Sequence, residues 1–410
     1  MYKQSVMKIL HTSDWHLGHQ LYEYDRIDEH RSFLQQLTCV MAEEQPDAMV
    51  VCGDVFDRVA PSAEARQLYV KALLALRDQC PDVQIIVMAG NHDGKAALEV
   101  EGMLWDRLQV KVVGQVERLE DGSVNFDRHI VEVHDNTGHA AGFIIAVPHI
   151  YEHGYPQLGE AQTKEERQRA FFQRLLDETA RRNPDGLPVV LTAHLSLTGS
   201  NFAGHTFAQS VGNIETVDQA TLGRGYDYLA LGHIHNAKTF TGEGPVARYC
   251  GTPLAISFDE TGHHGVTIVT LNPGEQPGIR EVDIRNPRPL LTIPDKPLPF
   301  EEALCELAGF PADKPAYIRL NVLYDAPLPY NYVEQILQTL QAKQARYCCV
   351  KTSLVKKKEN AEDESLVVNA DNMPDPLTLA DFFYLKKFKV TLADQQRKML
   401  EEVVNQCREA

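Results

Sequence analysis

Short apolar runs alternate along the chain with longer segments in which apolar residues recur at helical spacing. Apolar runs within 7–14, 47–54 and 83–93 predict buried strands, and the segments 26–45 and 61–78 predict helices between them. The order strand, helix, strand, helix, strand favours an α/β domain with parallel strands at its core. Each predicted strand ends in polar residues, at the edge where open α/β sheets bind ligands.

The same pattern continues to about residue 284. Strands are predicted within 142–150, 188–197 and 226–240, and a polar helix is predicted near 162–182. Residues 246–284 contain further strand-like runs separated by turns. The predicted elements up to this point form one large domain.

The rest of the chain is organised differently. A proline-rich stretch at 284–300 predicts a domain boundary, and a polar, charged segment predicts a linker. Between them, helices near 300–308 and 330–343 and strands near 316–322 and 346–352 predict a small α/β module. Two helices, split near Val390–Thr391, are expected at the end. The predicted parts are a large domain (1–285), a small module (286–355), a linker (356–375) and a helix-loop-helix segment (376–410).

Composition narrows the class of protein. The 410 residues are too many for one ordinary core, and 43% hydrophobic content is normal for a globular protein. We find no apolar run of about 18 residues and no apolar signal segment near the start, so a cytoplasmic location without a membrane span is expected. The eight scattered cysteines predict reduced thiols. A net charge of −17 argues against coating nucleic acid by bulk charge, but allows local binding of phosphates through metal ions.

The polar strand ends share one chemistry. They are Asp14-x-His16, Gly53-Asp54-x-x-Asp57, Gly90-Asn91-His92-Asp93, Ala193-His194 and Gly232-His233-x-His235. Each one alone is explained by an ordinary turn or by a hydrogen-bonded core histidine. Five such junctions in one chain instead predict a metal centre, because hard divalent ions accept mixed carboxylate, imidazole and amide ligands. Two ions held close together activate phosphoryl displacement.

In this order the motifs resemble those of the calcineurin-like metallophosphoesterases. The segments HTSDWHLG, GDVFD, AGNHD, LALGHIH and RYCGTPLAISFDE more closely resemble the SbcD-type DNA repair nuclease subunits. The resemblance is strong over residues 7–285 and looser beyond them. It implies a two-sheet sandwich flanked by helices, with a small α/β capping module that contacts DNA and a C-terminal helical pair.

The resemblance also implies a role for each motif residue. Two divalent ions are expected, with manganese as the first choice and magnesium as the alternative. The implied ligands are Asp14, His16, Asp54 and His235 for the first ion, and Asp54, Asn91, His194 and His233 for the second, so that Asp54 bridges.

Residues beside these ligands have implied roles of their own. His92 would stabilise or protonate the leaving oxygen, and Asp57 would orient and charge His92. Asp93 would support the loop. Arg58 is expected to be solvated, because Val59 stands where the protein phosphatases have glycine.

Two segments outside the motifs leave alternatives open. Lys356, Lys357 and Lys358 either contact a DNA backbone or form the solvated start of the linker. The terminal helices have apolar faces that predict a partner surface or packing onto the chain itself. These apolar residues are Phe382, Phe383, Leu385, Phe388, Leu392, Met399, Leu400 and Val403. The resemblance implies binding to the coiled-coil base of an SbcC-type, SMC-like ATPase in a heterotetramer, and a homodimer through the first helices.

Three functions remain at this point. The first is the nuclease subunit of an SbcCD-type complex, an exonuclease (3'-5') and an endonuclease on hairpins or blocked ends in DNA repair and recombination. The second is a phosphatase or small-molecule phosphodiesterase on the same scaffold, which would not need the extra module and tail. The third is a scaffold with a decayed site, which is disfavoured because every ligand position is filled.

Overall fold

The structure is a computed structural model. It describes residues 6–100, 102–121, 123–200, 216–242, 244–324 and 327–354, together with 377–378, 380–381, 384–385 and 396–400. The chain divides into two compact units, residues 1–354 and 355–410. All the strand-end motifs belong to the first unit.

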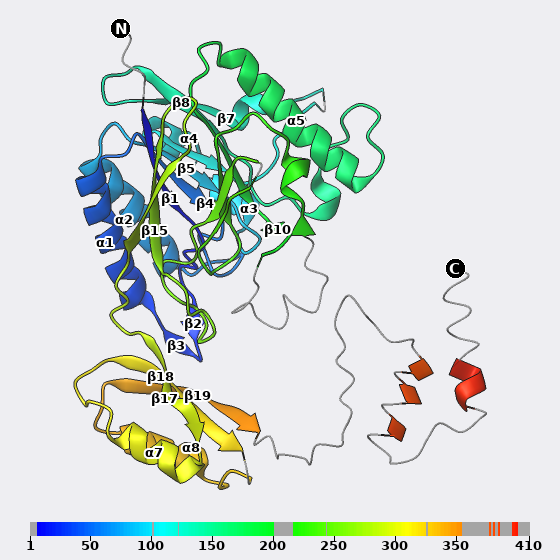
Figure 1. Cartoon of the computed structure of the whole chain (residues 1–410). Helices are drawn as coiled ribbons and strands as arrows, with labels where there is room; N and C mark the ends of the chain where they lie inside the picture. The colour runs from blue at the N-terminus through cyan, green and yellow to red at the C-terminus, as the bar shows by residue number, and fades with distance from the viewer. Residues whose placement is uncertain are drawn as a thin grey trace. The chain divides into compact units, whose positions relative to one another are not determined.

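A six-stranded sheet contains the first three motif strands (Figure 1). Its order is β16-β15-β1-β4-β5-β6, in which β1, β4, β5 and β6 are parallel and β15 and β16 antiparallel. The bounds are β1 Met7–Thr12, β4 Ala48–Cys52, β5 Gln84–Met88, β6 Val110–Val113, β15 Gly265–Leu271 and β16 Gly278–Asp283. The parallel β1, β4 and β5 were predicted from their apolar runs, whereas β6 was not.

A second six-stranded sheet contains the other two motif strands. Its order is β13-β14-β12-β9-β8-β7, and β8, β9, β12 and β14 are parallel. The bounds are β7 Ile130–His134, β8 Ala140–Ile145, β9 Val189–His194, β12 Tyr228–Gly232, β13 Lys238–Phe240 and β14 Val246–Tyr249. Gly232 pairs with His194 in the register, so the motifs at the ends of β9 and β12 lie side by side.

The two sheets pack face to face. The core between them combines residues of the first sheet, such as Ile9 and Val50, with residues of the second, such as Ile144 and Val190. Helices α1 (Ile27–Glu44) and α2 (Ala63–Gln79) pack on the outer face of the first sheet, and α5 (Lys164–Arg182) packs on the outer face of the second (Figure 1). This architecture confirms the predicted α/β class and the two-sheet sandwich flanked by helices.

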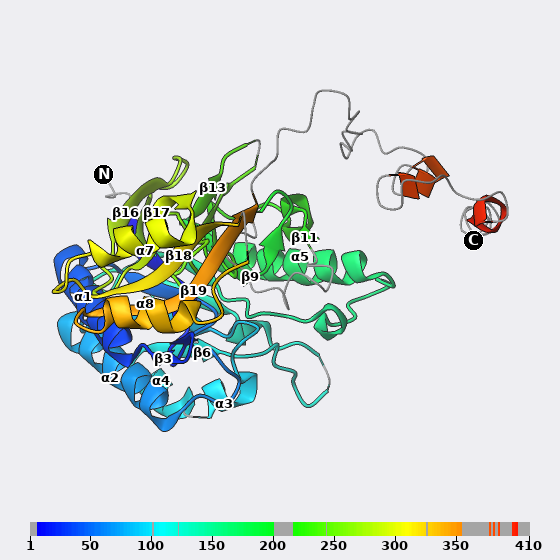
Figure 2. The same ribbon diagram turned by 90° about the horizontal axis from the view of Figure 1, so that it is seen from below.

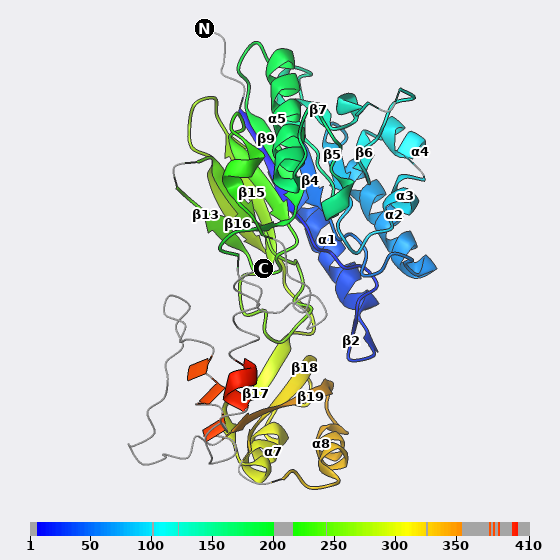
Figure 3. The ribbon, with the colours of Figure 1, turned by 90° about the vertical axis from the view of Figure 1, so that its right-hand side faces the viewer.

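Shorter elements complete the large domain. They are the hairpin β2 (Gln20–Leu21) and β3 (Tyr24–Asp25), helices α3 (Lys95–Glu99) and α4 (Gly102–Arg107), strands β10 (Ser196–Leu197) and β11 (Thr216–Val217), and 3-10 turns at Phe126–Arg128, Glu152–Gly154 and Gln219–Leu222. Helices α3 and α4 contact β6 on the side of α2 (Figure 3).

A small module follows the large domain. Its parallel sheet has the order β17-β18-β19, with bounds Leu290–Leu298, Ala316–Tyr324 and Ala345–Leu354. Helices α7 (Phe300–Ala308) and α8 (Tyr332–Leu340) cover one face of this sheet (Figure 2). The prediction that 284–300 is only a boundary was wrong, because part of it forms β17. Proline is tolerated there because β17 is an edge strand.

The other face of the small sheet contacts the large domain. Tyr317 of β18 is buried against Leu21 and Phe258. Its hydroxyl donates to Oε1 of Glu29 in α1 at 2.7 Å. Module and large domain therefore share a packed, hydrogen-bonded interface.

Parts of the sequence predictions lie beyond the described residues. These parts are the linker with Lys356, Lys357 and Lys358, and most of the apolar residues of the terminal segment. Of that segment the structure describes short helical pieces, in which the amide of Gln396 donates to the Tyr384 hydroxyl at 3.3 Å and Arg397 pairs with Asp381. Among the helices described, none is both long and apolar enough to cross a membrane.

Candidate metal centre

The five polar strand ends meet where the carboxyl ends of the two sheets lie together. The loops after β1 and β4 are joined by backbone hydrogen bonds: the N–H of Asp14 donates to Gly53 O at 2.9 Å, and the N–H of His16 donates to Asp54 O at 3.0 Å. The backbone N–H of His233, from the second sheet, donates to the carboxylate of Asp14 at 3.1 Å. Residues far apart in the sequence are thus held within one small volume.

The backbone at this junction is in an unusual conformation. Positive φ angles occur at Asp14 (52°), His16 (45°), Asp54 (50°) and His233 (96°). Non-glycine residues rarely adopt this region, and they do so mainly where a functional geometry requires it. Four such residues in one cluster therefore indicate a site whose side-chain directions are imposed by the fold.

Two glycines allow the close approach of the motif loops. A Cβ at Gly90 would lie 2.0 Å from Oδ1 of Asp54, and a Cβ at Gly232 would lie 1.8 Å from the carbonyl oxygen of Cys52. Any side chain at these positions would push Asp54 or the two sheets apart. This explains why glycine precedes the motif residues after β5 and at the end of β12.

One group of buried side chains consists of Asp14, His16 and His235. Each offers a ligand atom within 4.8 Å of the others. Among the described residues, neither ring nitrogen of the buried His16 has a hydrogen-bond partner. Buried polar atoms are normally satisfied, so these nitrogens fit a bound cation.

A second group consists of Asp54, Asn91, His194 and His233. Oδ1 of Asn91 lies 2.9 Å from Nε2 of His194 and 3.0 Å from Nδ1 of His233. Nε2 of His194 lies 3.3 Å from Oδ2 of Asp54. A carboxylate, an amide oxygen and two imidazoles therefore converge, which is a donor set suited to a divalent transition ion.

Asp54 lies between the two groups. The same Oδ2 that faces His194 is 3.9 Å from Nε2 of His16, while Oδ1 accepts a hydrogen bond of 2.8 Å from the backbone N–H of His92. The carboxylate is almost completely buried. Its position is the one that a bridging ligand requires.

The charges of the site act strongly on one another. Burial alone would lower the pKa of His16 and His194, but the nearby carboxylates outweigh it and raise both values to about 9. Burial and then the charge of His16 lower the pKa of His235 to about 3. Against the effect of burial, these histidines hold the pKa of Asp54 well below its usual range. The donors thus form a buried, charge-coupled group that fits divalent cations.

His92 lies beside the first group. Its Nδ1 is 2.9 Å from the backbone oxygen of Asp57, and its ring centroid is 5.0 Å from that of His16. The carboxylate of Asp57 has Oδ1 3.6 Å from Nδ1 of His16. Asp57 therefore contacts His92 through its carbonyl and faces His16 with its side chain.

Asp93 and Arg58 occupy contrasting environments. The buried Asp93 accepts hydrogen bonds from the backbone N–H groups of Val55, Phe56 and Gly90, at 3.1, 2.9 and 2.8 Å. It ties the loop after β4 to the loop after β5. The side chain of Arg58 is 72% exposed, and its Nε lies 3.6 Å from Oδ2 of Asp57.

Sequence reasoning assigned no role to two residues next to the centre. Oε1 of Glu260 lies 3.0 Å from Nδ1 of His235, and Nδ1 of His149 lies 3.1 Å from the backbone oxygen of His194. Glu260 ends the segment RYCGTPLAISFDE, and His149 follows β8 as the other histidines follow their strands. These positions were the only signals in the sequence that pointed to either residue.

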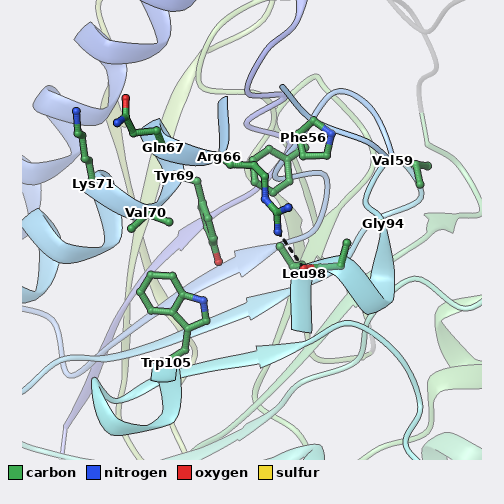
Figure 4. Close-up of a pocket in the computed structure, with 12 residues that line it drawn as sticks. Phe56, Val59, Arg66, Gln67, Tyr69, Val70, Lys71, Gly94, Leu98 and Trp105 are labelled. Atoms are coloured by element: carbon green, nitrogen blue, oxygen red, sulfur yellow. Dashed lines mark hydrogen bonds between the residues drawn. The ribbon is translucent and has the colours of Figure 1, made fainter. Parts of the chain in front are cut away.

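A separate cavity of about 370 Å³ lies between α2 and the helices after β5 (Figure 4). Phe56, Tyr69, Leu98 and Trp105 give it an apolar lining, and Arg66 donates to Ala97 O at 3.4 Å. None of the candidate ligands lines it. We therefore assign the hydrolytic chemistry to the strand-end centre.

Comparison with known families agrees with this geometry. The model of the calcineurin-like phosphoesterase family matches residues 7–237, which is more than half of the chain. That range includes all five strand-end motifs. Fold, motifs and match together define a calcineurin-like phosphoesterase.

Similar curated proteins narrow the class. The SbcD subunit of the SbcCD nuclease of Rhodobacter capsulatus is 34% identical over 319 residues, covering 75% of this chain and 77% of the relative. The SbcD subunit of Bacillus subtilis is 33% identical, covering 70% and 71%. The SbcD subunit of Escherichia coli K12 is 26% identical, covering 97% and 96%. The chain therefore belongs to the SbcD family of nuclease subunits, which are metal-dependent phosphodiester hydrolases.

Proposed function

We propose that this chain hydrolyses DNA phosphodiester bonds as the nuclease subunit of an SbcCD-type complex, with two divalent ions at the strand-end centre. The observation that carries the proposal is the position of Asp54, whose Oδ2 faces His194 at 3.3 Å and His16 at 3.9 Å. A carboxylate shared by two groups of nitrogen and oxygen donors is what a two-ion site needs.

The ligand sets follow from the two groups. Asp14, His16, Asp54 and His235 hold one ion, and Asp54, Asn91, His194 and His233 hold the other. When bound, the two ions activate a water molecule and stabilise charge on the phosphate. Mixed carboxylate, imidazole and amide donors support Mn²⁺ as the ion, with Mg²⁺ as the alternative.

His92 is the group that moves a proton. Because a backbone carbonyl can only accept, the contact of Asp57 O with Nδ1 of His92 requires a proton on that nitrogen. Nε2 is then the atom that exchanges a proton with the leaving oxygen. Asp57 holds the ring through its carbonyl and adds negative charge near His16 and His92 through its carboxylate.

The partner is an SbcC-type, SMC-like ATPase, as the relatives' name of an SbcCD complex supports. The terminal helical segment is its binding site, and the assembly is a heterotetramer built on a homodimer of this chain. The complex acts on DNA in the cytoplasm.

The experiment is incubation of the purified chain with labelled duplex and single-stranded DNA in Mn²⁺, Mg²⁺ or EDTA, with and without the ATPase. Cleavage in Mn²⁺ that EDTA abolishes is the expected result. Efficient hydrolysis of p-nitrophenyl phosphate with intact DNA would instead identify a phosphatase. The variant His134→Ala, at an exposed histidine remote from the motifs in sequence, serves as a control that should cleave DNA like the wild type.

A further inference from the structure

The segment RYCGTPLAISFDE ends in a buried carboxylate that the proposed chemistry does not use. Glu260 is 6% exposed, and its Oε1 lies 3.0 Å from Nδ1 of His235. Its Oε2 accepts hydrogen bonds from the backbone N–H of Ile256 at 3.0 Å and from the hydroxyl of Thr252 at 3.3 Å. The carboxylate is therefore held in place independently of His235.

This contact determines how His235 can act. A carboxylate that accepts from Nδ1–H fixes the tautomer and the orientation of the imidazole and makes Nε2 a better ligand. Outer carboxylates of this kind are common behind metal-binding histidines. Glu260 is in the position of such a partner.

The two residues before Glu260 are held from the small module. Arg319 of β18 donates from Nη1 to Oδ1 of Asp259 at 2.7 Å and from Nη2 to the backbone oxygen of Phe258 at 3.3 Å. The guanidinium carbon lies 5.1 Å from the centre of the Phe258 ring. Nε of Arg319 donates to the hydroxyl of Thr292 in β17 at 3.1 Å. This one side chain therefore links the sheet of the module to the loop that carries Glu260.

The start of the same loop is also connected to the module. The buried Arg26 donates to the backbone oxygen of Ala255 at 2.8 Å, and its guanidinium carbon lies 5.9 Å from the ring centre of Tyr317. Tyr317 and Arg319 are two residues apart in β18 and therefore point to the same face of the sheet. That face contacts residues 255–260 directly through Arg319 and through Arg26 from Tyr317.

We propose that Glu260 is the positioning residue for His235, and that the small module controls it through Arg319. The inference rests on the proposed function in taking His235 as a metal ligand. Movement of the module shifts Phe258 and Asp259, and with them the carboxylate that orients His235. The module thereby sets how firmly one of the two ions is held.

The test is a titration of the full chain with Mn²⁺, followed by calorimetry and by electron paramagnetic resonance. Glu260→Gln should weaken one of the two ions by about 10–100-fold and leave the other as in the wild type. Arg319→Ala should weaken the same ion by a smaller factor. Asp259→Asn tests the same link at a carboxylate that is 57% exposed, where a folding defect is not expected.

The matched control is Arg346→Ala. Arg346 projects from β19 of the same module, with its guanidinium carbon 5.2 Å from the ring centre of Tyr24 and its Nη1 3.4 Å from the Tyr317 hydroxyl. It should bind both ions like the wild type. The double variant Glu260→Gln/Arg319→Ala should bind like Glu260→Gln alone, because Arg319 acts through Glu260.

The outcomes separate the inference from the proposed function. Wild-type affinities in Arg319→Ala and Asp259→Asn would overturn the link to the module, and wild-type affinities in Glu260→Gln would overturn the positioning role. An equal loss in Arg346→Ala would show a general effect of disturbing the module and would also overturn the link. A wild-type chain that binds fewer than two ions would instead contradict the proposed function itself.

Discussion

Oδ2 of Asp54 lies 3.3 Å from Nε2 of His194, across the junction of the two sheets. Asp54 follows β4 of the first sheet, and His194 ends β9 of the second. The ring of His194 is fixed by a second contact to the first sheet, because its Nδ1 is 2.8 Å from the backbone oxygen of Cys52. The centre therefore forms only when the two sheets pack in this register.

Gly90 should not tolerate a side chain. In Gly90→Ala the added Cβ would lie 2.0 Å from Oδ1 and 2.3 Å from the backbone nitrogen of Asp54, so the loop must move. We expect a loss of roughly 1–3 kcal/mol in the free energy of unfolding and weaker binding of Mn²⁺. Denaturant unfolding and calorimetry measure the two effects. Gly242→Ala, where no atom lies within 4 Å of the added Cβ, should behave like the wild type.

His92 should be needed for turnover and not for metal binding. His92→Ala removes the group that exchanges a proton with the leaving oxygen, which is typically worth about 10²–10⁴-fold in rate. The variant should retain both ions and bind DNA, as shown by metal analysis and by a gel-shift assay in Ca²⁺. Loss of an ion in this variant would mean that His92 is itself a ligand.

The buried His11 should make stability depend on pH. Its ring contacts the Tyr228 hydroxyl at 2.9 Å, and burial, followed by the charge of Arg248, lowers its pKa from 6.5 to about 3. Between these values the unfolded chain binds a proton that the folded chain does not bind. The contribution of His11 is therefore constant above pH 6.5 and becomes less favourable as the pH falls towards 3.

The variant His11→Gln tests this pH dependence. Its free energy of unfolding in EDTA should fall between pH 7 and pH 5 by about 2 kcal/mol less than that of the wild type. Urea unfolding at the two pH values measures the difference, and His134→Gln at the surface is the control. The same fall in His11→Gln and wild type would show that His11 is not neutral in the folded chain.

The C-terminal unit should be separable from the metal centre. All candidate ligands lie in the unit of residues 1–354, so a chain that ends at Leu354 should retain both ions and its thermal stability. It should lose association with the ATPase, because the apolar terminal helices are absent. Full recovery of the ATPase in a pull-down with the shortened chain would place the interface on the large domain or the small module.

The sequence predicted the parts of the structure that depend on local pattern. Apolar runs that end in glycine and a polar residue located β1, β4, β5, β9 and β12, and parallel strands bring such ends to one edge of a sheet. Strand β17 was missed because its prolines indicate a boundary, although an edge strand accepts them.

The partners of the ligands were not predictable in the same way. Glu260 reaches His235 only through the tertiary fold, and Arg319 meets Asp259 across the interface with the module. Neither contact leaves a spacing pattern in the sequence. The resemblance identified the ligand positions, whereas the structure alone shows what holds them.

The most direct test of the account is the number of Mn²⁺ ions bound per chain in the wild type and in Asp54→Asn. The amide keeps the shape of the side chain but lacks the charge that both groups share, so bridging should fail. After removal of unbound metal, plasma mass spectrometry should find two ions in the wild type and at most one in the variant, with DNA cleavage lost. Two ions in Asp54→Asn would contradict the shared position of Asp54 and the two-ion centre built on it.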